Sequence, residues 1–349
     1  MSTQKAIVMV SPGVASLVRD RPIPQPRDGY ILVKTVAVAL NPTDWKSIDY
    51  RAAKGSLVGW DYAGIVEEVT SGVTKDLKKG DLVFGAAMGN NAYRTEEGAF
   101  AEYVVAKGDL ANRVPGNLSP EEAATLPLGL MTVCQGMYMA LGLARPETPI
   151  QQTVPILIYG GSTATGSLAI QFAKLSGYTP ITVCSPSNFD FVKDRGAIAA
   201  FDYHDPDCGR KIREYTNNSL KLVWDTVSLP SSAAICAEAL SSATGGKYYT
   251  ILPEKSPRPD VESKTTLAYL LFGEPLLRDG NLQEGKQEDF RYTVDFVSKA
   301  ATLVAEGKVK PHPAQVGKDG LKGVLEGLQL MREGKVSRAK LVYRVGETP

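Results

Sequence analysis

Residues 154–174 constrain the fold more than any other stretch of this chain. They begin with a short apolar run, 156–159, which is typical of a buried parallel strand. A loop of small residues follows at 160–166, and beyond it apolar side chains recur at helical spacing. A strand, a small-residue loop and a helix in this order form the first unit of a dinucleotide-binding fold. The loop lets backbone N–H groups and the helix N-terminus approach a pyrophosphate.

The glycine spacing of this loop is only partly the usual one. Gly160 and Gly166 fit it, but Thr163 and Ala164 stand where glycines are common. A tight turn that binds no ligand is the alternative interpretation of the same residues. The cofactor-binding residues that we predict in this loop are Gly160, Ser162, Thr163, Ala164, Thr165 and Gly166.

The second strand is expected at 180–184, and a Ser-Pro-Ser-Asn sequence follows it. A site for NAD normally carries Asp or Glu at the end of this strand, bound to the ribose 2′-hydroxyl. No acid stands here, and Ser185 and Ser187 are able to donate hydrogen bonds to a 2′-phosphate. Lys193 and Tyr203 come next, although a solvated helix face is the alternative for Lys193. The pattern favours NADPH over NADH, and the predicted contacts are Ser185, Pro186, Ser187, Asn188, Lys193 and Tyr203.

The composition indicates a soluble globular protein. The 349 residues suggest two domains, and 43% of them are hydrophobic and 22% charged. A net charge of +1 with no basic block gives no support to nucleic-acid or membrane-surface binding. The N-terminal residues lack the apolar core of a secretory signal, and four scattered cysteines indicate no disulfide framework. We therefore expect a cytosolic protein.

The remaining segments divide into two kinds. Residues 1–125 contain short candidate strands separated by Gly and Pro turns, a pattern that indicates a β-rich, barrel-like domain. Strands then alternate with helices as far as Leu252, which favours a parallel sheet. Two polar stretches rich in Pro and Gly, 253–264 and 274–289, are predicted to be surface loops. A strand that starts at Val309 is expected to return to the first domain, and a last strand is expected at 339–345.

The order of these parts, together with short motifs, resembles a known family. The N-terminal motifs Asn41-Pro-Thr-Asp44, Gly59-Trp-Asp-Tyr-Ala-Gly64 and Lys79-Gly-Asp-Leu-Val83 resemble those of the medium-chain dehydrogenase/reductases. Four further motifs resemble the fungal trans-acting enoyl reductases, which work with highly reducing polyketide synthases, as in the lovastatin pathway. These motifs are Tyr159-Gly-Gly-Ser-Thr-Ala-Thr165, Ser185-Pro-Ser-Asn188, Phe201-Asp-Tyr203 and Phe272-Gly-Glu274.

The resemblance implies an α/β protein with two domains. One is a β-rich GroES-like catalytic and substrate domain at 1–127 and 295–349. The other is a Rossmann-type NADPH-binding domain with a doubly wound parallel sheet at 128–294. It also implies a monomer that uses NADPH and acts on an acyl chain carried by a partner polyketide synthase.

The resemblance also bears on metal binding. Zinc enzymes of the superfamily have a cysteine where this chain has Asn41 and a histidine where it has Trp60. Their structural zinc needs four cysteines in the loop that corresponds to 86–98, which has none, and the only two histidines, His204 and His312, lie elsewhere in the sequence. We therefore expect no zinc.

Candidate catalytic residues are Lys46 and Thr132. The resemblance places Lys46 in a segment beside the nicotinamide, where it would act as a donor or acid, and the alternative is a surface lysine. For Thr132 the alternative is a helix threonine bonded to its own backbone. Further cofactor positions taken from the resemblance are Thr43, Asp44, Trp45, Lys46, Ile251, Leu252, Val336 and Ser337. An acyl pocket is predicted at Met131, Leu270 and Phe272, with plain core packing as the alternative.

Without zinc, the chain suits reduction of a polarised C=C bond, in which hydride reaches the β-carbon of an α,β-unsaturated thioester and an enolate develops. Two other functions are compatible with the same residues. One is a stand-alone quinone or enone reductase, and the other is a non-enzymatic NADPH-binding protein.

Overall fold

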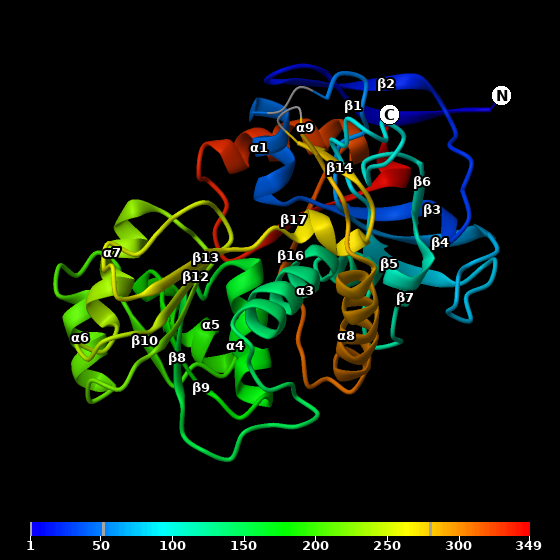
Figure 1. Cartoon of the computed structure of the whole chain (residues 1–349). Helices are drawn as coiled ribbons and strands as arrows, with labels where there is room; N and C mark the ends of the chain where they lie inside the picture. Colours follow the sequence, from blue (N-terminus) through cyan, green and yellow to red (C-terminus); the bar gives the residue numbers. More distant parts are fainter. Residues whose placement is uncertain (1, 51–52, 279–280) are drawn as a thin grey trace. The chain divides into compact units, whose positions relative to one another are not determined.

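The computed structural model describes residues 2–50, 53–278 and 281–349 (Figure 1). The chain forms two compact units. The β-rich unit comprises Met1–Leu128 and Tyr269–Pro349, and the α/β unit comprises Gly129–Ala268. The sequence places the boundaries after residues 127 and 294, whereas the contacts assign 269–294 to the β-rich unit.

The α/β unit is built on a six-stranded sheet in the order β10-β9-β8-β11-β12-β13. Every neighbouring pair is parallel. The strands are β8 (Pro155–Tyr159), β9 (Thr179–Val183), β10 (Ala199–Phe201), β11 (Leu222–Asp225), β12 (Lys247–Thr250) and β13 (Glu262–Thr265). Counted along the unit, the order is 3-2-1-4-5-6, the doubly wound order of dinucleotide-binding sheets. The predicted Rossmann-type fold is therefore confirmed.

Helices cover both faces of this sheet (Figure 1). They are α4 (Ala164–Leu175), α5 (Phe189–Asp194), α6 (Cys208–Tyr215) and α7 (Pro230–Ala239). Leu157 and Tyr159 of β8 share a buried cluster with Ile212 of α6 and Cys236 of α7. Because side chains alternate along a strand, Ile156 and Ile158 point to the opposite face, on the side of α4, and both are fully buried.

Two features of this unit differ from the sequence prediction. Residues 253–264 were expected to be a surface loop, but their end belongs to β13, which pairs with β12. β13 rather than β12 is therefore an edge of the sheet. The apolar run 128–140 predicts one helix, but the structure has a short α-helix, α3 (Pro127–Val133), followed by a π-helix, η2 (Cys134–Ala140). A Cβ on Gly136 would lie 2.3 Å from Cζ2 of Trp224, so glycine permits this close contact.

The β-rich unit contains a seven-stranded sheet in the order β16-β17-β3-β4-β5-β7, with β6 also paired to β3, and a two-stranded sheet β1-β2. These strands are β1 (Thr3–Ser11), β2 (Val14–Pro22), β3 (Tyr30–Ala39), β4 (Asp61–Val69), β5 (Leu82–Ala86), β6 (Tyr103–Lys107), β7 (Asn112–Arg113), β16 (Ala314–Gly317) and β17 (Lys340–Arg344). The predicted return of the C-terminal part to the first domain is confirmed, because β16 pairs with β17 and β17 pairs antiparallel with β3.

Helices of the β-rich unit are α1 (Pro42–Tyr50), α2 (Pro120–Ala123), α8 (Gln287–Ala305) and α9 (Gly320–Arg332), and a 3₁₀ turn, η4 (Ala268–Phe272), begins at the boundary. Residues 274–289, expected to be a loop, contain the hairpin β14 (Leu276–Arg278) and β15 (Asn281–Gln283) and the start of α8. Residues 279–280 of that stretch lie outside the described residues. Figure 1 shows the hairpin in yellow, labelled at β14.

Candidate functional site

The loop between β8 and α4 is close-packed at three glycines. Gly160 adopts φ +83°, which favours glycine. A Cβ on Gly161 would lie 2.1 Å from Oγ1 of Thr182, and a Cβ on Gly166 would lie 2.2 Å from the carbonyl oxygen of Gly160. These are the tight turn and the close helix–strand packing that a phosphate-binding loop needs. The sequence prediction missed Gly161, although the paired glycines after the strand were a signal for it.

Thr163 joins this loop to α4 and to β11. Its hydroxyl oxygen accepts a hydrogen bond from the backbone N–H of Gly166 at 2.9 Å and so caps α4. The same oxygen lies 3.2 Å from Oγ1 of Thr226, which donates to the carbonyl of Tyr159 at 2.8 Å. β8 and β11 are the strands at which the order of the sheet reverses, and ligands of such sheets bind at the carboxyl ends of these strands. Ser162, Ala164 and Thr165 are half-buried around the cap.

The carboxyl end of β11 is held by Asp225, which is fully buried. Its Oδ1 accepts hydrogen bonds from the N–H groups of Val227 and Ser228 at 2.9 and 2.8 Å. Its Oδ2 accepts one from the hydroxyl of Tyr248 at 2.8 Å. Burial raises the pKa of Tyr248 well above its usual value, so this hydroxyl remains a donor. The sequence prediction assigned no role to Asp225.

Ser228 links this turn to two predicted cofactor residues. Its Oγ lies 3.1 Å from the N–H of Ile251 and 3.3 Å from that of Leu252, and both N–H groups donate to it. Ile251 and Leu252 directly follow β12, so the turn draws the end of β12 to the end of β11. The structure therefore brings Ile251 and Leu252 to the same edge of the sheet as the glycine loop.

The predicted 2′-phosphate residues gather after β9 and β10. Oγ of Ser185 lies 3.1 Å from the hydroxyl of Tyr203, although 18 residues separate them. The ring of Tyr203 packs on His204 at 4.1 Å and is 41% exposed, so its hydroxyl remains accessible. Of the other predicted contacts, Asn188 is buried, whereas Pro186, Ser187 and Lys193 are exposed.

In the β-rich unit, α1 carries four predicted residues. Oδ2 of Asp44 accepts a hydrogen bond from the backbone N–H of Asn41 at 2.6 Å, as an N3 acid does in a helix cap. Asp44 is 1% exposed, and burial raises its pKa well above the usual value. Its carboxyl group is thus directed into the protein, which leaves the backbone as the part of Asp44 suited to a ligand.

Lys46 is half-buried two residues later on the same helix. Its Nζ lies 5.6 Å from the centre of the Trp45 ring, and Trp45 packs against the buried core of the unit. Burial lowers the pKa of Lys46. An ammonium group with a lowered pKa gives up a proton more readily, which suits a general acid.

An aromatic cluster surrounds Trp60, the residue at the position of a zinc-binding histidine. The rings of Tyr269 and Phe272 meet the Trp60 ring edge to face, with centroids 4.7 and 5.7 Å away. The hydroxyl groups of Thr43 and Tyr269 are hydrogen-bonded. Phe272 is only 3% exposed, whereas Leu270 is half-buried. Phe272 is therefore packed as a core residue in this structure.

The remaining predicted residues lie on α3 and between α9 and β17. Met131 is buried and Thr132 half-buried on α3. Val336 packs partly against the core of the β-rich unit, and Ser337 is exposed. In the α/β unit, Tyr138 places its hydroxyl 2.9 Å from Oγ of Ser176.

Asn41, predicted to stand where zinc enzymes of the superfamily have a cysteine, belongs to a hydrogen-bonded network with Asp61 and Lys340. Nδ2 of Asn41 donates to Oδ2 of Asp61 at 2.9 Å, and Nζ of Lys340 lies 2.5 Å from the same oxygen. Within residues 2–50, 53–278 and 281–349, no group of three or more His, Cys, Asp or Glu side chains is placed to hold a metal ion. All four cysteines lie in the described part of the chain, are buried and form no disulfide bond.

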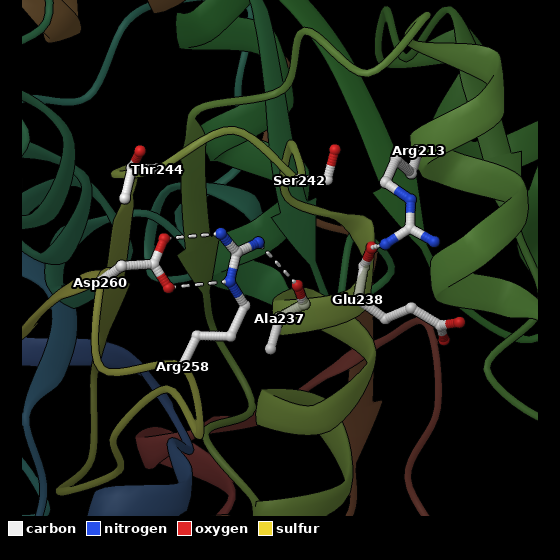
Figure 2. Close-up of a pocket in the computed structure, with 7 residues that line it drawn as sticks. All are labelled: Arg213, Ala237, Glu238, Ser242, Thr244, Arg258 and Asp260. Atoms are coloured by element: carbon white, nitrogen blue, oxygen red, sulfur yellow. Dashed lines mark hydrogen bonds and ion pairs between the residues drawn. The ribbon is translucent and has the colours of Figure 1, made fainter.

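A shallow cavity of about 570 Å³ lies elsewhere on the α/β unit (Figure 2). It is lined by Arg213, Ala237, Glu238, Ser242, Thr244, Arg258 and Asp260. Figure 2 shows Arg258 held by Asp260 and by the carbonyl oxygen of Ala237, so its donors are used within the protein. Thr244 and Asp260 precede β12 and β13, which puts this cavity at the amino ends of the strands, opposite the glycine loop.

Comparisons with known proteins agree with this architecture. Residues 27–116 match the alcohol dehydrogenase GroES-like domain family. The chain is 47% identical over 356 residues to the trans-enoyl reductase resD of Aspergillus sclerotiorum, covering 98% of this chain and 100% of that one. It is 45% identical over 347 residues to the trans-enoyl reductase ACTTS2 of Alternaria alternata, covering 99% and 100%. The structure of the quinone oxidoreductase from Coxiella burnetii matches with a TM-score of 0.71 and 25% identity over 99% of this chain and 100% of that one. No helix in the described part of the chain is long and apolar enough to cross a membrane.

Proposed function

Because this chain belongs to the fungal trans-enoyl reductases of the medium-chain dehydrogenase/reductase superfamily, we propose that it reduces the enoyl thioester of a polyketide carried by a separate polyketide synthase. The single observation that carries the proposal is identity of 47% to a trans-enoyl reductase along essentially the whole of both chains. The protein acts as a cytosolic monomer, and its partner is the synthase that presents the acyl chain.

The superfamily fold implies a nicotinamide cofactor, and we propose NADPH. The glycine loop supports this, since Gly160, Gly161 and Gly166 leave no room for side chains where a pyrophosphate would approach. The hydroxyl groups of Ser185 and Tyr203 meet where an NAD-specific chain would carry an acid. Both hydroxyls donate hydrogen bonds to a 2′-phosphate. NADPH, when bound, supplies the hydride.

Lys46 is the proposed catalytic donor. As hydride reaches the β-carbon, negative charge develops on the thioester oxygen, and one well-placed donor to such an oxygen is worth about 2.7–4 kcal/mol. The lowered pKa of Lys46 also suits transfer of a proton toward the α-carbon. Thr132 is the second candidate and would orient the cofactor. No zinc takes part, because Asn41 and Trp60 supply neither of the ligands that zinc prefers.

The test measures NADPH oxidation by the purified protein with an enoyl thioester of pantetheine and with the same acyl group on a carrier protein. Reduction of both, faster on the carrier, is the expected result. NADPH oxidation with small quinones but with neither thioester would make the protein a quinone reductase. NADPH binding without turnover on any of these substrates would make it a non-enzymatic binding protein.

A further inference from the structure

Glu274 is the meeting point of three cationic side chains in the β-rich unit. Its Oε1 lies 2.7 Å from Nζ of Lys107. Its Oε2 lies 3.1 Å from a terminal guanidinium nitrogen of Arg27 and 3.7 Å from Nε of Arg94. Burial alone would raise the pKa of Glu274, but Lys107 and Arg27 hold it below its usual value, so the carboxylate stays ionised at neutral pH.

The three cations come from separate parts of the chain. Arg27 precedes β3, Arg94 lies between β5 and β6, and Lys107 ends β6. Arg27 and Glu274 are 247 residues apart. The side chains of Glu274 and Lys107 are 20% and 13% exposed, so water screens their interaction less than it screens a surface pair. The contacts therefore tie the segment around Glu274 to three fixed points of the β-rich unit.

The backbone at Glu274 is equally confined. Nε2 of Gln287, at the start of α8, donates to the carbonyl of Gly273 at 2.7 Å. A Cβ on Gly285 would lie 2.2 Å from the backbone nitrogen of Glu274. Gly273 itself adopts φ +64°. Residues 273–274 thus have little freedom to shift while the ionic contacts remain.

The segment just before Glu274 carries two of the three predicted acyl-lining residues, Leu270 and the core-packed Phe272. Its upstream end is fixed by Tyr269, which packs on Trp60 and is hydrogen-bonded to Thr43. Leu270 is half-buried between the aromatic contact and the ionic one. We propose that Glu274 is a positioning residue which, through Lys107, Arg27 and Arg94, holds the segment 269–272 and thereby sets the enzyme's preference among acyl chains. This inference rests on the proposed enoyl reductase function.

The experiment compares Glu274→Gln, which keeps the shape and removes the charge, with Glu274→Asp and with the control Glu121→Gln. Glu121 also accepts from an arginine of the β-rich unit, Arg344, and the side chain of Arg344 is 49% exposed. Substrates are a short and a long enoyl-pantetheine thioester. For Glu274→Gln, kcat/KM for the long thioester should fall about tenfold and that for the short one less than about twofold, because charged hydrogen bonds are lost at a half-buried site. NADPH affinity should not change, and Glu274→Asp should retain most of the wild-type ratio.

A second measurement does not depend on turnover. Hydrogen exchange of the backbone amides at 268–275 should accelerate at least about fivefold in Glu274→Gln and stay unchanged in Glu121→Gln. Equal losses on both thioesters, or weaker NADPH binding, would show general structural damage and overturn the proposal. So would unchanged kinetics and exchange. If the wild type reduces no enoyl thioester, the proposed function fails, while the exchange result still decides whether Glu274 holds the segment.

Discussion

Replacing Lys340 by methionine should strongly destabilise the β-rich unit. Lys340 is 3% exposed and Asp61 fully buried, and Nζ of Lys340 lies 2.5 Å from Oδ2 of Asp61. The carboxylate of Asp61 also accepts hydrogen bonds from Nδ2 of Asn41 at 2.9 Å and from the N–H of Leu128 at 2.8 Å. Lys340→Met keeps the length of the aliphatic stem but removes the only cation among these contacts.

The expected cost follows from the burial of this pair. Removing one partner of a buried ion pair typically costs about 3–5 kcal/mol. The side chain of Asn41 and the backbone N–H of Leu128 still donate hydrogen bonds to the carboxylate of Asp61 in the variant. We therefore expect the free energy of unfolding to fall by about 3 kcal/mol. For a unit of this size that is a fall in Tm of about 6–12 °C.

Urea and thermal denaturation of Lys340→Met measure this cost. The double variant Asp61→Asn with Lys340→Met should be more stable than the sum of the single losses predicts. The control Lys299→Met breaks an exposed pair with Asp295 and should change stability little. A loss in Lys340→Met below about 1 kcal/mol, or additive single losses, would refute the reasoning.

The further predictions concern the cofactor, the reaction and metal binding. Ser185→Asp should shift binding from NADPH toward NADH in fluorescence titrations, and equal affinity of the wild type for both would contradict the assignment. Lys46→Ala should leave NADPH binding intact but slow enoyl reduction by about one to two orders of magnitude. Because burial lowers the pKa of Lys46, the wild-type rate should fall as the pH rises through that lowered value, and Lys46→Ala should lack this fall. Gly161→Ala should weaken NADPH binding, since its Cβ would meet Thr182 at 2.1 Å. Elemental analysis after chelator treatment should find no stoichiometric zinc, with activity unchanged.

The sequence predicted the α/β unit well because its signals are local. Buried parallel strands appear as short apolar runs, and the glycines after β8 follow from the turn that they must make. The resemblance supplied the landmarks around Asn41 and Trp60. Ser185 and Tyr203 could be paired in advance because the carboxyl ends of neighbouring parallel strands always meet at one edge.

Features that depend on distant residues had no local signal. β13 is four residues of mostly polar sequence after several prolines, so neither hydrophobic alternation nor length marked it as a strand. Asp61 and Lys340 are 279 residues apart, and nothing near either one predicts the other. Asp44 was predicted to contact the cofactor, but the fold uses its carboxyl group to cap α1, a role visible only once Asn41 is in place.

The network around Asp61 bears on our proposal that this enzyme works without a metal. A buried carboxylate needs a compensating positive charge, and here the ammonium of Lys340 supplies it. The amide of Asn41 turns its donor nitrogen toward the same carboxylate, and Trp60 is packed against Tyr269 and Phe272. A metal ion placed among these groups would have to displace the ammonium group of Lys340. It would also face Nδ2 of Asn41, which is a hydrogen-bond donor and not a metal ligand. This donor set supports our proposal of a zinc-independent enzyme. In such an enzyme, the charge that develops on the thioester oxygen must be met by protein hydrogen-bond donors, and this is the role we give to Lys46.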